Sequence, residues 1–185
     1  MGAGNQPDIA DGVMHEPEVA LRLAFWLLDR CGGSPHADLS IDGANIKIEA
    51  RAVFDIQAFL KEHGWLAESL RDGWRGTYRR DNRTLSIKSA PGFDVQVTCD
   101  DKRIRAECKG GRLRPKGRSA SAILASAIGQ AIACADGADS EQLWIAVPDS
   151  ESFEKACRRI MAGAVFKRTG IQIALVSRTG TRVIR

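Results

Sequence analysis

Two carboxylates and one ammonium lie close together in a short stretch of alternating residues. Apolar and polar side chains alternate over residues 93–98 and again over residues 104–109. Because successive side chains of a strand point to opposite faces, this alternation predicts two strands, each with one face for a core and one for chemistry. Asp94, Glu107 and Lys109 all fall on the polar face. Two carboxylates beside an ammonium can hold a divalent cation and a water molecule.

The turn between the two strands decides which residues face each other. If Asp100 and Asp101 alone form a two-residue loop, Asp94 lies directly opposite Glu107. If the loop has four residues, from Asp100 to Arg103, the polar face is kept but the pairing changes. In either register the partners lie roughly 5–8 Å apart, which is close enough for both carboxylates to contact one cation.

These residues resemble the PD-(D/E)xK phosphodiesterase superfamily, which has the restriction-endonuclease-like fold. The matching segments are Pro91-Gly92-Phe93-Asp94, a stretched form of the Pro-Asp pair, and Glu107-Cys108-Lys109. The resemblance implies that Asp94, Glu107 and the main-chain carbonyl of Cys108 bind Mg²⁺ (or Mn²⁺). It also implies that Lys109 orients or polarises the attacking water. The expected activity is therefore that of a metal-dependent endonuclease, a hydrolase of phosphodiester bonds.

Two further residues take roles from the same resemblance. Many members carry a Gln or Tyr that faces the site from the helix after the hairpin, and this chain has Gln130 on such a helix; a solvent-facing Gln130 is the alternative. Members also often carry a Glu on the helix before the first strand, where this chain has Asp55. Glu49 and Glu62 are rival candidates for this accessory acid.

A run of basic residues directly follows Lys109. The Gly- and Pro-containing segment 110–118 carries Arg112, Arg114, Lys116 and Arg118. Cations beside a proposed metal site suit a phosphodiester backbone, because they neutralise and hydrogen-bond its phosphates. The segment therefore predicts a nucleic-acid partner, and DNA is favoured over RNA. A solvated flexible loop is the alternative interpretation.

Composition is typical of one α/β domain without a membrane segment. The chain has 185 residues, 44% of them hydrophobic, and a net charge of +4, so it can bury one sizeable core. No apolar run approaches the roughly 18 residues of a membrane-spanning helix. Residues 1–15 predict a flexible tail instead of a signal peptide. The five scattered cysteines favour reduced thiols in the cytoplasm over a zinc site.

Hydrophobic periodicity and end signals place the elements that must hold this hairpin. Helices are expected over residues 16–31, 50–63, 119–135 and 150–167. Strands are expected over 77–80, 85–88, 143–147 and 171–176, together with the hairpin of residues 94–109 and a small hairpin over 39–48.

This order of elements matches the αβββαβ core of the superfamily over residues 50–147. We therefore predict an α/β fold, a mixed central sheet flanked by helices, in a single domain from residue 16 to residue 185. Residues 16–48 would add an N-terminal helix and hairpin to this core, and residues 150–185 an α-β extension.

Two other classes of protein fit the same residues. One is a non-catalytic nucleic-acid-binding module on the same fold, which metal-dependent cleavage would distinguish from a nuclease. The other is an unrelated α/β protein in which the three polar residues form an ion pair on a solvated strand and the basic loop binds an acidic partner. The sequence does not specify duplex, junction or single-strand substrates, sequence preference, or a role in restriction, repair or recombination. It is compatible with a homodimer but does not require one.

Overall fold

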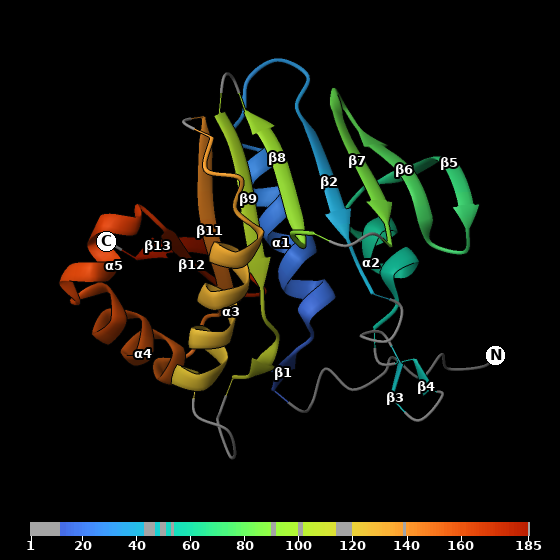
Figure 1. Ribbon diagram of the computed structural model, residues 1–185. Helices are drawn as coiled ribbons and strands as arrows, with labels where there is room; N and C mark the ends of the chain where they lie inside the picture. The colour runs from blue at the N-terminus through green and yellow to red at the C-terminus, as the bar shows by residue number, and fades with distance from the viewer. Residues whose placement is uncertain are drawn as a thin grey trace.

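A mixed sheet of nine strands is the central layer of the part of the chain that the computed structural model describes (Figure 1). That part comprises residues 12–42, 47–48, 51–52, 54–89, 92–99, 102–113, 120–138 and 140–184. The strand order is β13-β12-β11-β9-β8-β2-β7-β6-β5, and the pairs β1-β10 and β3-β4 form two small separate sheets.

The described residues form thirteen strands and five helices. The strands are β1 (Val13–Met14), β2 (His36–Ser40), β3 (Lys47–Ile48), β4 (Arg51–Ala52), β5 (Leu66–Asp72), β6 (Arg75–Arg80), β7 (Arg83–Lys88), β8 (Val95–Cys99), β9 (Lys102–Cys108), β10 (Gly111–Arg112), β11 (Glu141–Pro148), β12 (Gln172–Val176) and β13 (Thr181–Ile184). The helices are α1 (Glu16–Leu28), α2 (Ile56–Glu62), α3 (Ala120–Cys134), α4 (Glu151–Met161) and α5 (Ala164–Thr169).

The sheet is mixed, with parallel neighbours in both of its halves, since β2 and β7 are also parallel. The strands β9, β11 and β12 are parallel neighbours, and helices form the crossovers that parallel strands require. By contrast, β8 is antiparallel to both β9 and β2, and β5, β6 and β7 form an antiparallel meander. The predicted α/β class, with a large mixed sheet flanked by helices, is confirmed at this level of detail.

The hairpin β8–β9 has the tighter of the two registers considered from the sequence. Cys99 pairs with Lys102 and Val95 pairs with Ala106, so the loop contains two residues. The four-residue loop is therefore wrong. Asp94, immediately before β8, consequently stands opposite Glu107.

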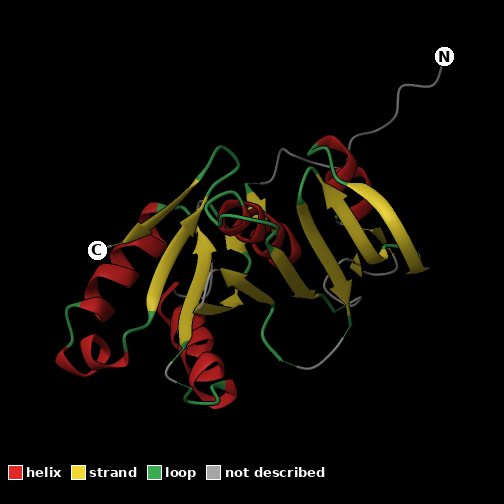
Figure 2. Cartoon of the chain, turned by 90° about the horizontal axis from the view of Figure 1, so that it is seen from above, coloured by secondary structure: helices red, strands yellow, loops and turns green. Residues whose placement is uncertain are grey.

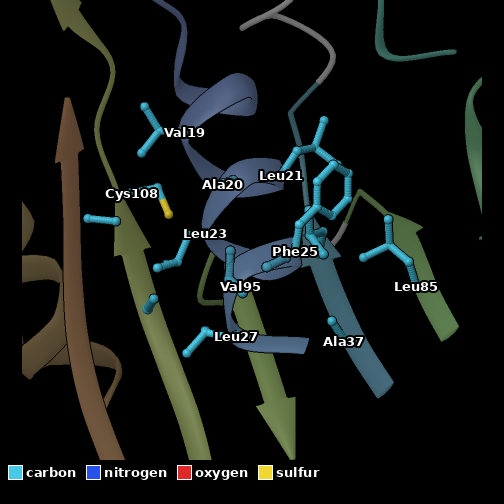
Figure 3. Packing of buried hydrophobic residues seen from close by; sticks show 14 of the residues in the cluster. Val19, Ala20, Leu21, Leu23, Phe25, Leu27, Ala37, Leu85, Val95 and Cys108 are labelled. Atoms are coloured by element: carbon cyan, nitrogen blue, oxygen red, sulfur yellow. The ribbon is translucent and has the colours of Figure 1, made fainter. Parts of the chain in front are cut away.

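Helix α1 packs against the middle of the sheet and fills the larger core (Figure 3). It is apolar almost all the way round, as expected for a buried helix. Its first turn contains Glu16 and Glu18, whose charges favour a helix N-terminus. Its buried side chains meet β2, β8 and β9, and Cys108 points toward the helix from the far end of β9 (Figure 3). The helix expected over residues 16–31 is confirmed, although it ends at Leu28.

The two faces of the sheet are covered unequally. Helices α1 and α2 lie on one face, and α3 lies on the other, over β9 and β11 (Figures 1 and 2). Leu124, Ala127, Ile145 and Phe153 belong to the second core, which α3 and α4 share with β11 and β12. On the α3 side of β8, β2, β7 and β6, no helix of the described chain covers the sheet (Figure 2).

Several expected elements differ in the structure. The small hairpin over 39–48 is wrong, because β2 pairs with β7 and β8 instead. The helix expected from residue 50 begins only at Ile56, and residues 51–52 form a strand. The helix expected over 150–167 ends at Met161 and restarts at Ala164. Strands β5 and β13 were not expected, since β5 is exposed along its whole length and has no alternating pattern.

The cysteines are not all free thiols. Cys31, after α1, and Cys99, at the end of β8, form a disulfide with their Cα atoms 5.3 Å apart, which is an ordinary separation. The expectation of reduced thiols is therefore wrong for this pair. Cys108 and Cys157 are free and buried, and Cys134 is free and exposed. None of the described helices is long and apolar enough to cross a membrane.

Candidate active site

The end of the β8–β9 hairpin brings three of the predicted site residues together. Asp94 Oδ2 accepts a hydrogen bond of 2.7 Å from the N–H of Cys108. Lys109 Nζ donates to Glu107 Oε1, also at 2.7 Å. Glu107 is only 6% exposed, so its charge is held largely away from water. Two carboxylates and an ammonium thus form one half-buried cluster.

Glu16 joins this cluster from the first position of α1. Its Oε2 lies 3.7 Å from Lys109 Nζ, and its charge interacts with those of Asp94 and Glu107. Glu16 is not among the predicted site residues, because residues 16–48 were expected to lie outside the core. The available signal was an acidic residue in the first turn of a largely apolar helix that precedes a strand of the sheet.

The backbone around Gly110 fixes the position of Glu16 relative to Lys109. Val13 and Met14 pair with residues 111–112 in the small β1–β10 sheet. A Cβ atom at Gly110 would lie 2.6 Å from the Glu16 nitrogen and 2.8 Å from the Met14 oxygen. Only glycine therefore allows the chain after Lys109 to pass this close to the start of α1.

A small pocket opens beside Asp94. The space in it that the centre of a water molecule can reach is about 10 Å³, enough for about one water or small cation. Three of its lining residues are acidic and come from different elements. The lining consists of Glu16, Pro17, Ala20, Ser40, Ile41, Asp42 and Asp94.

Among the residues that the structure describes, the cluster contains more carboxylates than cations, and their pKa values reflect this excess. Burial, followed by the charges of Glu107 and Glu16, raises the pKa of Asp94 to about 7 despite the Cys108 hydrogen bond and Lys109. Burial and the neighbouring carboxylates also raise the pKa of Glu16. For Lys109, burial alone would lower the pKa, but the hydrogen bond to Glu107 and the surrounding negative charges raise it. Such shifts concentrate at functional sites.

The residues present fit a hard divalent cation by donor type. Among the described residues, no three His, Cys, Asp or Glu side chains converge closely enough to form a metal site by themselves. Mg²⁺, however, usually takes one or two carboxylates and keeps several waters. Asp94 and Glu107 are such a pair, and a cation between them would relieve the excess negative charge.

Cys108 contributes to the site through its backbone. Its thiol is fully buried beside α1, and burial raises its pKa well above the usual value, so it stays protonated. The neighbouring backbone is held firmly, because the N–H of Lys109 donates to the Ala146 carbonyl at 2.9 Å. The main-chain carbonyl of Cys108 therefore stays the predicted third ligand.

The two accessory residues lie elsewhere. Asp55 is outside the cluster and caps α2, where its Oδ1 accepts the N–H of Ala58 at 3.0 Å. This cap explains why an acid stands there without any catalytic role. Gln130 is on the exposed side of α3, and in the described chain no contact joins it to the cluster. Glu62 is exposed at the end of α2, and Glu49 lies outside the described residues.

The basic segment is described only in part. Arg112 is exposed in β10, three residues beyond Lys109. Arg114, Lys116 and Arg118 lie outside the described residues. Phosphate binding by these four basic residues thus stays a prediction.

Comparisons with known proteins add no further assignment. No family model, no curated protein and no solved structure matches this chain. The function is therefore inferred from the cluster and from the topology that positions it.

Proposed function

We propose that this protein is a metal-dependent nuclease with a restriction-endonuclease-like core, and that its substrate is nucleic acid, with DNA favoured. The observation that carries the proposal is the convergence of Asp94, Glu107 and Lys109 with Glu16. Glu16 supplies the helix-borne acid that the PD-(D/E)xK resemblance led us to expect at Asp55.

The order of the elements supports the same proposal once the core is counted from α1. The series α1, β2, β8, β9, α3 and β11 follows the αβββαβ order, and β2, β8 and β9 are neighbours in the sheet. The proposed core thus begins at residue 16 instead of residue 50. Residues 41–93 become an insertion between its first two strands.

Each residue of the cluster has a distinct proposed role. Asp94, Glu107 and the Cys108 carbonyl would hold Mg²⁺ or Mn²⁺, which neutralises phosphate charge and lowers the pKa of a bound water. Lys109 holds the attacking water and offsets the negative charge that develops on the phosphate. The Cys108 N–H orients Asp94. The reaction is hydrolysis of a phosphodiester bond, and by the resemblance it leaves a 5′-phosphate.

A cytoplasmic location and possible self-association belong to the same proposal. Nucleic-acid substrates favour the cytoplasm. The Cys31–Cys99 disulfide is an observation against that location, because disulfides are rare in the reducing cytosol. A homodimer fits a nuclease that cuts two strands, and gel filtration of the purified chain tests it.

A cleavage assay tests the proposal directly. Labelled duplex, single-stranded, junction and RNA substrates are incubated with Mg²⁺, Mn²⁺ or EDTA. Wild-type protein should cleave at least one substrate only with a metal ion. Glu107→Gln should lower the rate at least about a thousandfold, which corresponds to about 4 kcal/mol of transition-state stabilisation. Glu151→Gln, which changes an exposed glutamate of α4, is the matched control and should cleave normally.

Three results would overturn the proposal. Cleavage that continues in EDTA, or that survives Glu107→Gln, would exclude a metal site at this cluster. Binding of nucleic acid without cleavage under any metal condition would instead favour the non-catalytic module.

A further inference from the structure

The two carboxylates of the site belong to a row of residues that continues across two more strands. Glu107 stands opposite Asp94, as the β8–β9 register requires. Ser40 follows in the same row, because its N–H donates to the Asp94 carbonyl at 2.9 Å. Lys88 pairs with Ser40 on the next strand, β7. The row therefore reads acid, acid, hydroxyl and cation.

Alternation puts Ser40 and Lys88, together with Gln96 on β8, on the face of the sheet that no described helix covers. Their neighbours Leu39, Ile87 and Val95 are buried on the α1 side. Asp94 stands just before β8, at the end of this face, where it also lines the pocket beside the start of α1. The side chains on the uncovered face are mostly hydroxyls and amides, which can hydrogen-bond to phosphate and sugar oxygens. They include Thr77, Thr84, Ser86, Gln96 and Thr98, which occupy alternate positions on β6, β7 and β8.

Lys88 is placed to contact a phosphate near the proposed metal site. Neighbouring strands are about 4.8 Å apart, so two strand spacings put its backbone roughly 10 Å from that of Asp94. A lysine side chain can span part of this distance toward the site. That range suits a phosphate flanking the one being cleaved on the same strand of nucleic acid.

The present partner of Lys88 would not prevent this contact. Lys88 Nζ lies 3.3 Å from Asp38 Oδ1, and its side chain is 51% exposed. An ion pair this exposed contributes at most about 1 kcal/mol, so the ammonium can turn to a phosphate. Asp38 also lies 3.4 Å from His36 Nε2 and would repel a polyanion from the same face.

We propose that Lys88 binds a backbone phosphate next to the scissile one, so that the substrate strand lies across the uncovered face of β8, β2 and β7. This inference rests on the proposed function, because it extends the same site. It assigns the inserted strand β7 a role in holding substrate. It also assigns Asp38 an opposing role that limits affinity.

Equilibrium binding of a labelled DNA tests this arrangement without any cleavage. All variants are made in Glu107→Gln protein, and affinity is measured from low to moderate salt. Lys88→Ala should weaken binding and reduce the slope of log affinity against log salt by about 0.9 for duplex or about 0.7 for single-stranded DNA. Asp38→Asn should tighten binding. Lys61→Ala, which removes an exposed lysine of α2 on the opposite face, should change neither quantity.

A phosphate scan makes the test specific. Each phosphate near the cleavage position is replaced in turn by an uncharged methylphosphonate. One methylphosphonate replacement should weaken DNA binding by the Glu107→Gln protein. The same replacement should cause no further loss in the protein that also carries Lys88→Ala, because both changes remove the same contact. Thermal unfolding of each variant shows whether it is folded.

The outcomes separate the two proposals. If the Glu107→Gln protein binds no nucleic acid, the proposed function and this inference both fail. If the Glu107→Gln protein binds DNA, but Lys88→Ala matches Lys61→Ala in its salt dependence and in the methylphosphonate scan, only the inference is overturned.

Discussion

Two glutamates at the start of α1 lie in opposite electrostatic surroundings. Glu18 is 5% exposed and accepts hydrogen bonds from Arg22 Nε at 3.0 Å and Arg178 Nε at 3.1 Å. Arg178 also donates to the Val13 carbonyl at 3.0 Å. Glu16, two residues earlier, lies 3.7 Å from the Lys109 ammonium, which also pairs with Glu107.

The different surroundings indicate different roles: Glu18 supports the fold, and Glu16 is suited to bind a ligand. Two cations balance Glu18, and the resulting network ties the start of α1 to the β12–β13 turn. The Glu16 cluster has surplus negative charge in a half-buried place, which opposes folding. Natural proteins depart from good local electrostatics mainly at functional sites.

Removal of Glu18 should have the largest effect on stability. Glu18→Gln leaves two arginines without their buried partner, and breaking such a pair costs about 3–5 kcal/mol. Glu16→Gln, the matched change two residues away, should leave stability unchanged or raise it. Urea unfolding at pH 7.5 measures both. Equal destabilisation by the two variants would remove the distinction between the two surroundings.

Asp94→Asn should stabilise the protein, and the gain should depend on pH. Folding raises the pKa of Asp94 from 3.8 to about 7. As the pH rises between these values, the Asp94 carboxyl ionises in the unfolded chain before it does so in the folded protein. The stability of the wild type therefore falls over this pH range. At about 1.4 kcal/mol per pKa unit, the order of magnitude of the gain at pH 8 is 2–4 kcal/mol. Below about pH 4 the gain should vanish.

Urea unfolding in EDTA at several pH values checks this dependence on Asp94. Asp72→Asn changes an exposed aspartate and serves as the control. A gain that is the same at pH 4 and pH 8 would contradict a raised pKa. Added Mg²⁺ should stabilise the wild type more than Asp94→Asn, because only the wild type keeps both proposed carboxylate ligands.

The smallest predicted effect on stability concerns the backbone at Gly110, which passes close to the start of α1. Gly110→Ala places a methyl group against backbone atoms of Met14 and Glu16, and such overpacking typically costs about 1–3 kcal/mol. It should also slow cleavage by displacing Glu16. Gly129→Ala is the control in α3, where an added Cβ meets no atom within 4 Å, and should stabilise by about 0.5–1 kcal/mol. Normal cleavage by folded Gly110→Ala would contradict a requirement for Glu16.

Local patterns predicted the hairpin at the centre of the site. Alternation over β8 and β9 predicted the two strands but left two registers open, and the structure has the one that puts Asp94 opposite Glu107. The cap at Ser150 marked the start of α4. Both signals depend on residues close in sequence. Asp55 shows the limit of this approach. An acid before a helix looks the same whether it caps that helix or serves a distant site, and here it caps.

The features that the sequence did not predict depend on contacts between distant segments. Glu16 meets Lys109 because the β1–β10 pairing holds the start of α1 beside the end of β9. Cys31 and Cys99 are 68 residues apart in sequence, and cysteine spacing alone did not indicate their pairing. Strand β5 has no buried face, so the hydrophobic pattern that marks most strands is missing.

The hydrogen bond between Ser40 and Asp94 has a consequence for how this molecule can evolve. The chain leaves the sheet centre at Ser40 and returns beside it at Asp94, with the Ser40 nitrogen 2.9 Å from the Asp94 oxygen. An inserted segment whose ends meet in this way can lengthen, shorten or be exchanged while the strands at its base keep their places. Residues 41–93 also supply β7, which pairs with β2, and buried side chains such as Trp65 and Tyr78, so an exchanged segment must provide equivalent contacts. Related chains could acquire a different recognition surface there and still keep the acidic cluster unchanged.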